Sequence, residues 1–191
     1  MTSLSIPQPP LHRVGGNLAL DFANTISWRG TAHETDHIAT SRGLVRWAMD
    51  SGLLDDAAGA TPGEPCLPVA HRLRAAIRSV MEAALTDDNA AAERAVLLKV
   101  LRDALSSAQL AGAPAQLGFA DPCDRIIGSV ALAAVDLLRD DRIARLKMCP
   151  RDDCHWLFLD LSKNGSRRWC SMESCGNRAK IEQHRRRHKA R

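Results

Sequence analysis

Four cysteines in the last quarter of the sequence constrain the fold most, because they form two pairs with the same spacing. Four residues separate Cys149 from Cys154, four separate Cys170 from Cys175, and fifteen lie between the two pairs. Two short-range thiolate pairs suit a tetrahedral zinc ion, with each pair supplying one edge of the tetrahedron. The spacing therefore predicts one structural Zn2+ per chain, since four thiolates leave no open coordination position for water.

Other interpretations of these cysteines have to be weighed. Disulfides are disfavoured in a reducing cytoplasm, where we expect the chain to reside because no stretch has the pattern of a signal peptide or a membrane span. His155 is an alternative ligand beside Cys154. His184 and His188 form another histidine pair, but their spacing from the cysteines differs from that of a two-cysteine, two-histidine finger. Cys66 and Cys123 lie far from the cluster and are interpreted as small buried apolar residues.

The segment between the two cysteine pairs must leave the metal and return to it. A strand-like run precedes Asn164-Gly165, a dipeptide that favours a two-residue hairpin turn, and a second short run follows. The second cysteine pair then lies around the start of a helix. We therefore expect a treble-clef-like zinc module over residues 145–191, made of a knuckle, a β-hairpin and a C-terminal helix. A unit this small needs the metal to hold it together.

The rest of the chain predicts a mainly α fold, with a proline-rich arm over residues 1–15 and a helical domain over residues 16–144. Long apolar stripes at helical spacing occur in residues 66–85, 89–110 and 124–148. Shorter helical patterns occupy residues 15–30 and 40–54. Residues 57–65 have the composition of a loop, and residues 111–122 that of a strand or an extended connector.

Charge is divided unevenly between the two parts. Residues 1–144 carry a net charge of −4 and residues 145–191 a net charge of +8. From Arg178 onward seven Lys or Arg residues accompany one acid, and the segment has no apolar stripe that would bury it in a core. A basic helix directly behind a zinc module favours double-stranded DNA as its partner, and a solvated tail is the alternative. The expected contacts are Arg167, Arg168, Arg178, Lys180, Arg185, Arg186 and Arg187.

Two segments carry a resemblance to a known family. The stretches CPRDDCHWLFLDLSKNGSRRWC and SRRWCSMESCGNRAK resemble the CGNR zinc-finger proteins, which are named for the tetrapeptide that stands here at residues 175–178. The stretch GGNLALDFANT is similar to the opening of the ABATE domain, which accompanies this finger in bacterial proteins. The resemblance implies a helical N-terminal domain and a stress-linked transcriptional regulator.

Other function classes are weighed against a DNA-binding regulator. The sequence has no nucleophile elbow, P-loop or deaminase-type zinc signature, so we expect no enzymatic activity. A zinc module that binds RNA or a protein partner is the main alternative. In a regulator, the helical domain would sense a small-molecule effector or form a homodimer.

The stretch LDFANT bears on the effector question. Asp21 and Asn24 are polar residues inside an apolar segment, where they serve either as a cap or buried structural hydrogen bond, or as part of a small-molecule pocket. In the second case Trp28 and Trp47 would supply the apolar wall of that pocket. The sequence leaves both alternatives open.

Overall fold

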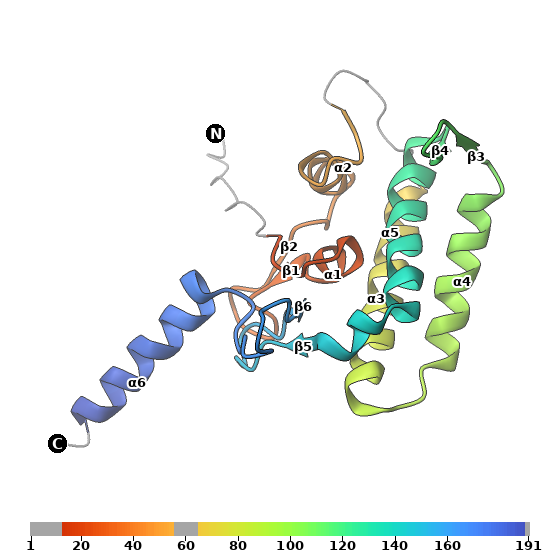
Figure 1. Ribbon diagram of the computed structural model, residues 1–191. Helices are drawn as coiled ribbons and strands as arrows, with labels where there is room; N and C mark the ends of the chain where they lie inside the picture. The colour runs from red at the N-terminus through yellow and green to blue at the C-terminus, as the bar shows by residue number, and fades with distance from the viewer. Residues whose placement is uncertain (1–12, 56–64, 190–191) are drawn as a thin grey trace, which may run out of the picture.

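The computed structural model describes residues 13–55 and 65–189, which form a helical body and a small cysteine-centred module (Figure 1). The prediction of a mainly α fold is confirmed. Residues 1–12 of the expected arm and residues 57–64 of the expected loop lie outside the described residues. The helices of the body are α1 (Leu18–Ala23), α2 (Ser41–Asp50), α3 (Cys66–Thr86), α4 (Ala91–Leu105) and α5 (Pro122–Arg139).

The helices α3, α4 and α5 lie side by side and bury the stripes that their sequences predict (Figure 1). Asp121 begins α5, because its Oδ1 accepts hydrogen bonds from the backbone N–H groups of the first turn and Pro122 follows it. Gly128 permits close packing, since a Cβ there would lie 2.6 Å from the ring of Phe119. The three helices contribute to one core Leu73, Ile77, Met81, Leu97, Leu101, Ile126, Val130, Ala134 and Leu137.

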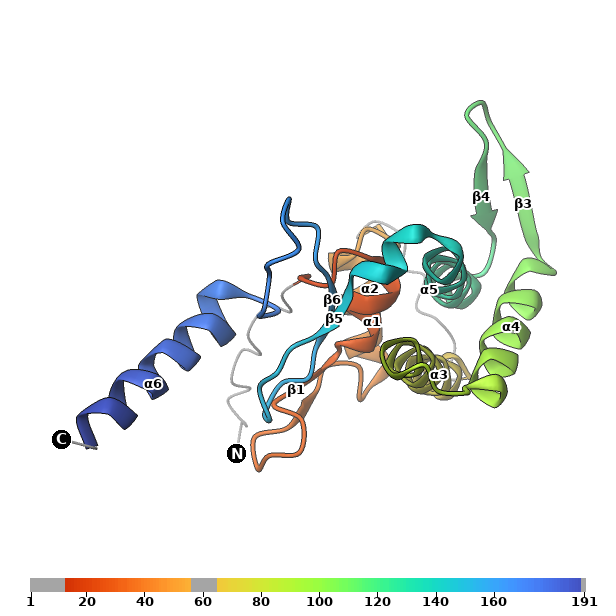
Figure 2. The same ribbon diagram turned by 60° about the horizontal axis from the view of Figure 1, so that its bottom comes forward.

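Helix α4 ends at Leu105, earlier than the pattern over residues 89–110 predicts. The strands β3 (Ala108–Ala111) and β4 (Gln116–Phe119) follow as an antiparallel hairpin, with Ala108 opposite Phe119. This hairpin projects beyond the helices (Figure 2) and settles the choice between strand and connector in favour of strand.

Cys66 and Cys123 form a disulfide, with their Cα atoms 5.6 Å apart. The interpretation of these residues as unpaired apolar side chains was therefore wrong. The bond joins the first turns of α3 and α5, which are 57 residues apart in sequence. Only the packing of the two helices brings the cysteines together, so no local pattern indicates the pair.

The last long helix is also shorter than its apolar pattern over residues 124–148 predicts. Helix α5 ends at Arg139, and the Asp140 side chain accepts a hydrogen bond from the backbone N–H of Arg142, which starts the 3-10 turn η1 (Asp141–Arg145). The chain then enters β5 (Leu146–Met148), which pairs antiparallel with β6 (Leu157–Leu159). The apolar residues of 146–148 therefore belong to a strand.

Strand β6 joins the cysteine module to the helical body. Leu157 and Leu159 are fully buried in the main core beside α1, whereas Phe158 between them belongs to the core around the cysteines. This division follows from the alternation of side chains along a strand. The main hydrophobic core therefore includes residues beyond position 145, where the zinc module was expected to begin. Within the described residues, no helix is long and apolar enough to cross a membrane.

A third short sheet is tied to the body by an ion pair. Strands β1 (Ile26–Ser27) and β2 (Thr35–Asp36) pair antiparallel, and Asp36 binds Arg74 of α3 with both carboxylate oxygens, at 2.6 and 2.7 Å. Burial raises the pKa of Asp36, but the hydrogen bonds and charge of Arg74 outweigh burial and leave that pKa below its ordinary value.

We expect Asp36→Asn to lower the free energy of unfolding by about 1.5–3 kcal/mol, because it removes a charge-assisted hydrogen-bonded pair. Because the pKa of Asp36 is lowered on folding, this stabilisation is fully present above the unfolded value near pH 4. It is lost as the pH falls from there through the folded value. Denaturant unfolding of both proteins from pH 7 to pH 3 measures the difference.

The matched control is Asp103→Asn, which removes an exposed pair with Lys99. Exposed pairs contribute little, so this change should leave the free energy of unfolding nearly unaltered. Equal effects of the two substitutions would contradict a stabilising role for the Asp36–Arg74 pair.

Candidate metal centre

The four cysteines of the predicted zinc site converge at one buried point. Their Sγ atoms all lie within 4.8 Å of one another, with 3.6 Å from Cys154 to Cys170 and 3.5 Å from Cys170 to Cys175. A tetrahedral zinc site with Zn–S bonds near 2.3 Å has S–S edges of about 3.8 Å, so these four atoms fit the ion. None of the four cysteines is more than 6% exposed. The geometry is that of a closed, structural site.

The first pair lies on the tight connection between β5 and β6. The backbone N–H of Cys149 donates to the carbonyl oxygen of Trp156 at 2.8 Å, and that of Cys154 donates to Arg151 at 3.0 Å. His155 has a φ of 53°, a left-handed conformation that returns the chain toward β6. These bonds fold residues 149–154 into the expected knuckle.

The second pair lies where the chain enters its C-terminal helix, as the spacing predicts. Cys175 is in the turn η2 (Met172–Gly176), which leads directly into α6 (Asn177–Lys189). The Ser171 hydroxyl caps this turn by accepting from the N–H of Ser174 at 3.3 Å. Gly176 lets the Met172 side chain pack closely there, because a Cβ would lie 2.5 Å from Sδ of Met172 and the side chain would have to move.

The hairpin of the module differs from the predicted one. Strands β5 and β6 enclose the first cysteine pair, instead of lying between the two pairs. Asn164-Gly165 does form a turn, with Gly165 at a φ of 60°, but no strand follows it within the described residues. Arg167 and Arg168 therefore lie on a loop. The expectation that the run after Asn164-Gly165 forms the second strand of a hairpin was wrong.

A buried carboxylate organises this loop. Asp160 accepts hydrogen bonds from Nζ of Lys147 at 2.6 Å, from the N–H of Ser162 at 3.0 Å and from the N–H of Arg167 at 2.8 Å. Lys147, and then Ser162, hold the pKa of Asp160 well below its ordinary range. With the Ser162 hydroxyl, which also donates to Asp160, four donors on one carboxylate hold this segment as a loop in place of the strand that the sequence suggests.

The four thiols need a cation to ionise together. Hydrogen bonding with Cys149 raises the pKa of both Cys154 and Cys170. Hydrogen bonds from Cys149 and the other thiols lower the pKa of Cys175, and Arg178 adds to that effect. A bound divalent cation removes this conflict, because it stabilises all four thiolates at once.

Arg178 points toward the metal centre. Its Nη2 lies 3.3 Å from Sγ of Cys175, and its Nη1 donates to Asp153 at 2.7 Å. The guanidinium also lies 4.2 Å from the ring centroid of Trp28, which comes from the loop after β1. The sequence carries no signal for the Trp28 contact, because 150 positions separate these two residues.

Arg167 is likewise bound inside the module. Its guanidinium lies 4.4 Å from the ring centroid of Phe158. Its side chain joins β6 and the loop before Cys170 to the N-terminal segment, since it donates to the carbonyl oxygens of Val14 (2.9 Å), Leu159 (3.2 Å), Trp169 (3.1 Å) and Cys170. These internal partners favour a structural use of Arg167 and Arg178, and contact of either with DNA stays a prediction.

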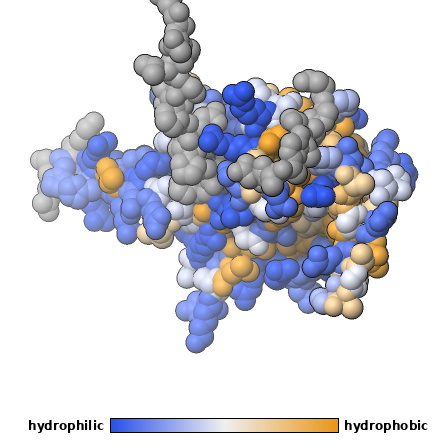
Figure 3. Space-filling model, turned by 90° about the horizontal axis from the view of Figure 1, so that it is seen from above, coloured by the Kyte–Doolittle hydropathy of each residue, from blue (hydrophilic) through white to orange (hydrophobic). Residues whose placement is uncertain are grey.

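The other expected nucleic-acid contacts are exposed. Arg168 lies over the ring of Trp169 at 5.0 Å, on the loop before the second cysteine pair. The remaining four are on α6, which projects away from the body (Figure 2) and is almost entirely hydrophilic over its visible face (Figure 3). These four are Lys180, Arg185, Arg186 and Arg187.

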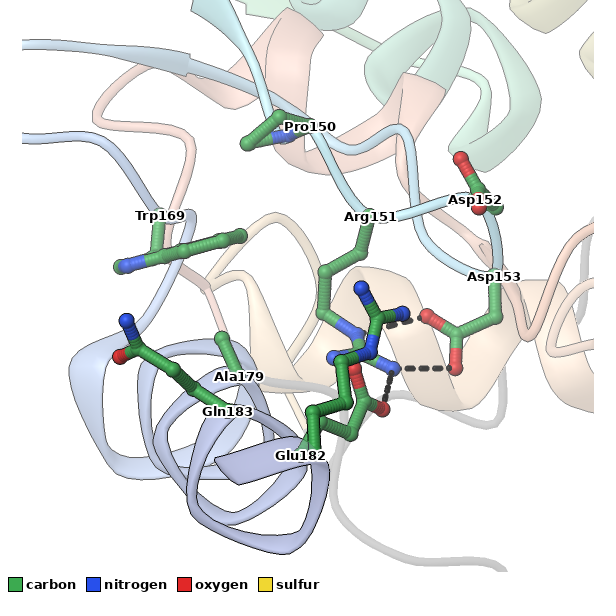
Figure 4. Close-up of a pocket in the computed structure, with 9 residues that line it drawn as sticks. Pro150, Arg151, Asp152, Asp153, Trp169, Ala179, Glu182 and Gln183 are labelled. Carbon is green, nitrogen blue, oxygen red and sulfur yellow. Dashed lines mark hydrogen bonds and ion pairs between the residues drawn. The ribbon is translucent and has the colours of Figure 1, made fainter. Parts of the chain in front are cut away.

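The base of α6 is held against the knuckle by ion pairs (Figure 4). Arg151 donates from Nε to Asp153 at 2.9 Å and from Nη2 to Glu182 of α6 at 2.9 Å. Asp153 and Glu182 raise the pKa of Arg151. A polar pocket of about 430 Å³ lies beside these pairs, between the knuckle, Trp169 and α6.

The residues of the expected effector pocket have different partners in the structure. Asp21 accepts from the N–H of Gly15 at 2.8 Å, and burial raises the pKa of Asp21. Asn24 makes two hydrogen bonds to the backbone of Leu157 in β6. Its Nδ2 donates to the carbonyl oxygen at 2.8 Å, and its Oδ1 accepts from the N–H at 2.9 Å. The two tryptophans do not form one wall, because Trp47 packs on Phe22 in the core while Trp28 covers Arg178. This geometry supports the structural alternative for Asp21 and Asn24.

Two family models match the chain. A model named ABATE, described as "Putative stress-induced transcription regulator", matches residues 16–141, and the CGNR zinc-finger model matches residues 145–188. A search of curated proteins found no match. Together with the four buried sulfur atoms, the finger match establishes one structural zinc ion per chain. The resemblance noted in the sequence is confirmed.

We expect purified protein to contain one zinc per chain and Cys170→Ser to contain none, since the substitution removes one of four ligands. The melting temperature of the substituted chain should also fall, because β6 supplies Leu157 and Leu159 to the main core. Elemental analysis and circular dichroism measure both effects. Cys66→Ser removes the disulfide and should leave the zinc in place. Wild-type protein without zinc would contradict the assignment.

We expect Arg178→Gln to weaken zinc retention by about 10- to 100-fold, the usual cost of losing a partner of a metal ligand. The guanidinium both donates to Sγ of Cys175 and fixes Asp153. Competition with a chromophoric chelator measures the change. Lys180→Gln removes the same charge from an exposed position of α6 and should leave zinc retention unchanged. Equal retention in the two variants would show that Arg178 does not support the site.

Proposed function

Because the chain belongs to the ABATE family and carries a CGNR zinc finger, we propose that it is a transcription regulator that binds double-stranded DNA through α6. The observation that carries the proposal is the placement of this basic helix. It projects from the molecule (Figure 2), and its base is anchored to the zinc knuckle by the Arg151–Glu182 and Arg178–Asp153 pairs.

The dimensions and charge of α6 support a duplex as its partner. The helix has 13 residues, which corresponds to about 20 Å in length. With its side chains it is about 10–12 Å wide, close to the width of about 12 Å of the major groove of B-DNA. The exposed cations Lys180, Arg185 and Arg187 can reach phosphates along such a groove. The net charge of −4 over residues 1–144 disfavours DNA contact by the body.

Duplex RNA fits this helix less well, since the deep, narrow major groove of A-form RNA does not admit side chains for reading. A module that binds single-stranded RNA or a protein partner remains the alternative function, without enzymatic activity. In the proposed regulator, which would act in the cytoplasm, the helical body senses an effector or forms a homodimer. Both of these roles stay predictions.

We expect zinc-loaded full-length protein to bind a 30-base-pair duplex with an affinity that falls steeply with salt, because each phosphate contact releases a counterion. Replacing Lys180, Arg185 and Arg187 together by Gln should flatten the slope of log affinity against log salt by up to about three units. Fluorescence anisotropy from 50 to 300 mM NaCl measures both proteins.

The contrary outcomes are distinct. Wild-type protein that binds no duplex even at the lowest salt would refute the DNA-binding proposal. Tighter binding of a single-stranded RNA of the same length would favour the alternative module. An unchanged slope in the triple variant would show that α6 is not the contact surface.

A further inference from the structure

Helix α6 has an inner face that is occupied by the zinc module. Arg178 and Glu182 on this face pair with Asp153 and Arg151 of the knuckle. Ala179, Gln183 and Arg186 line the polar pocket beside the knuckle and Trp169, as the labelled side chains of Figure 4 show in part. These contacts fix the rotation of the helix about its own axis, so that the opposite face must point away from the protein.

The opposite face carries a row of three residues that are neither Lys nor Arg. Ile181, His184 and His188 are spaced by three, four and seven positions, so they lie in line along the helix. We name them the outer row. All three are exposed, with Ile181 52% exposed. The two imidazole rings lie against each other, with 3.2 Å between their Nε2 atoms.

Cations flank the outer row on both sides. At 100° per residue, Lys180 and Arg187 border the row on one side and Arg185 borders it on the other. All three are exposed. Glu182 lies on the inner face, where Arg151 neutralises it, so its carboxylate is kept away from this surface. The described part of the outer face is therefore a row without Lys or Arg that has positive charge on both sides.

This distribution matches the major groove, where phosphates form the two walls and base edges form the floor. We infer that the outer row reads base edges, while Lys180, Arg185 and Arg187 bind the phosphates on either side. Ile181 offers an apolar surface to a thymine methyl group, and a histidine nitrogen can pair with acceptors such as N7 and O6 of guanine. The inference rests on the proposed function and names the surface that would recognise sequence.

A protein partner fits the outer row less well. Stable protein interfaces centre on a cluster of buried aromatic or apolar side chains surrounded by a polar rim. The outer row offers one aliphatic side chain, and its borders are cationic. The inference also moves base reading away from Arg178 and Arg167, whose guanidinium groups are bound inside the module.

Two adjacent arginines provide the first arm of the test. Arg187→Gln and Arg186→Gln make the same chemical change one position apart, but only Arg187 borders the outer row. The probes are a duplex selected from a random pool by the zinc-loaded full-length protein and a scrambled duplex. Arg187→Gln should weaken binding of both duplexes by about 3- to 10-fold and reduce the salt slope by about 0.9. Arg186→Gln should stay within about twofold of wild type.

The second arm tests the outer row itself. Ile181→Ala and His184→Ala should each reduce the preference for the selected duplex by about 5- to 100-fold, the range for one lost base contact, and leave binding of the scrambled duplex unchanged. Replacing thymine by uracil in the selected duplex removes the methyl group. It should weaken binding of wild type at one position and have no effect on Ile181→Ala. Zinc content and circular dichroism of every variant confirm that it is folded.

The failures of the inference and of the proposed function are distinguishable. If wild type binds duplex DNA but Arg186→Gln costs as much as Arg187→Gln, or if both outer-row variants keep the preference, the outer row is not the reading surface and DNA binding stands. If wild type binds duplex DNA but enriches no sequence from the pool, the inference that the outer row reads base edges is refuted and DNA binding stands. If wild type binds no duplex at low salt, the proposed function fails and the inference fails with it.

Discussion

Coordination of one ion by four thiolates is the constraint on which the C-terminal quarter of the molecule depends. The sulfur atoms come from two turns, one between β5 and β6 and one at the start of α6, and they meet within 4.8 Å. Among the described residues, the apolar side chains around them are few, and Phe158 is the one fully buried side chain beyond the cysteines in this small core. Metal binding thus replaces the hydrophobic core that so short a segment cannot build.

The same constraint explains why two of the arginines face inward. Seven Lys or Arg residues from Arg178 onward form a uniform basic run in the sequence. The structure divides such residues by distance from the metal, because Arg167 and Arg178 satisfy carbonyl oxygens, a carboxylate and a sulfur near the cluster. Among the described side chains further along α6, Lys180, Arg185, Arg186 and Arg187 are exposed. A count of positive charge therefore overstates the surface available to a polyanion.

Sequence alone predicted what depends on local spacing. The paired cysteines predicted the zinc site, and apolar stripes predicted α3, α4 and most of α5. It failed where distant contacts decide the structure. The disulfide between Cys66 and Cys123 requires two packed helices, and the strand β5 forms because β6 is available to pair with it. The donors around Asp160 likewise come from three separate points of the chain, so the loop after Gly165 differs from the strand that its residues suggest.

The stacking of Trp28 on Arg178 has a thermodynamic consequence. Trp28 belongs to the loop between β1 and β2 of the helical body and has a left-handed φ of 55°, while Arg178 lies at the base of α6. A change of that loop in the body therefore alters the energy of a cation that also contacts a zinc ligand. Coupling free energies are reciprocal. In the proposed regulator, a molecule that displaces Trp28 and thereby changes the affinity of α6 for DNA has its own affinity changed by DNA by the same factor. Trp28 thus adds an electrostatic contact to the packing of β6 and the Asn24 hydrogen bonds that already join the body to the finger.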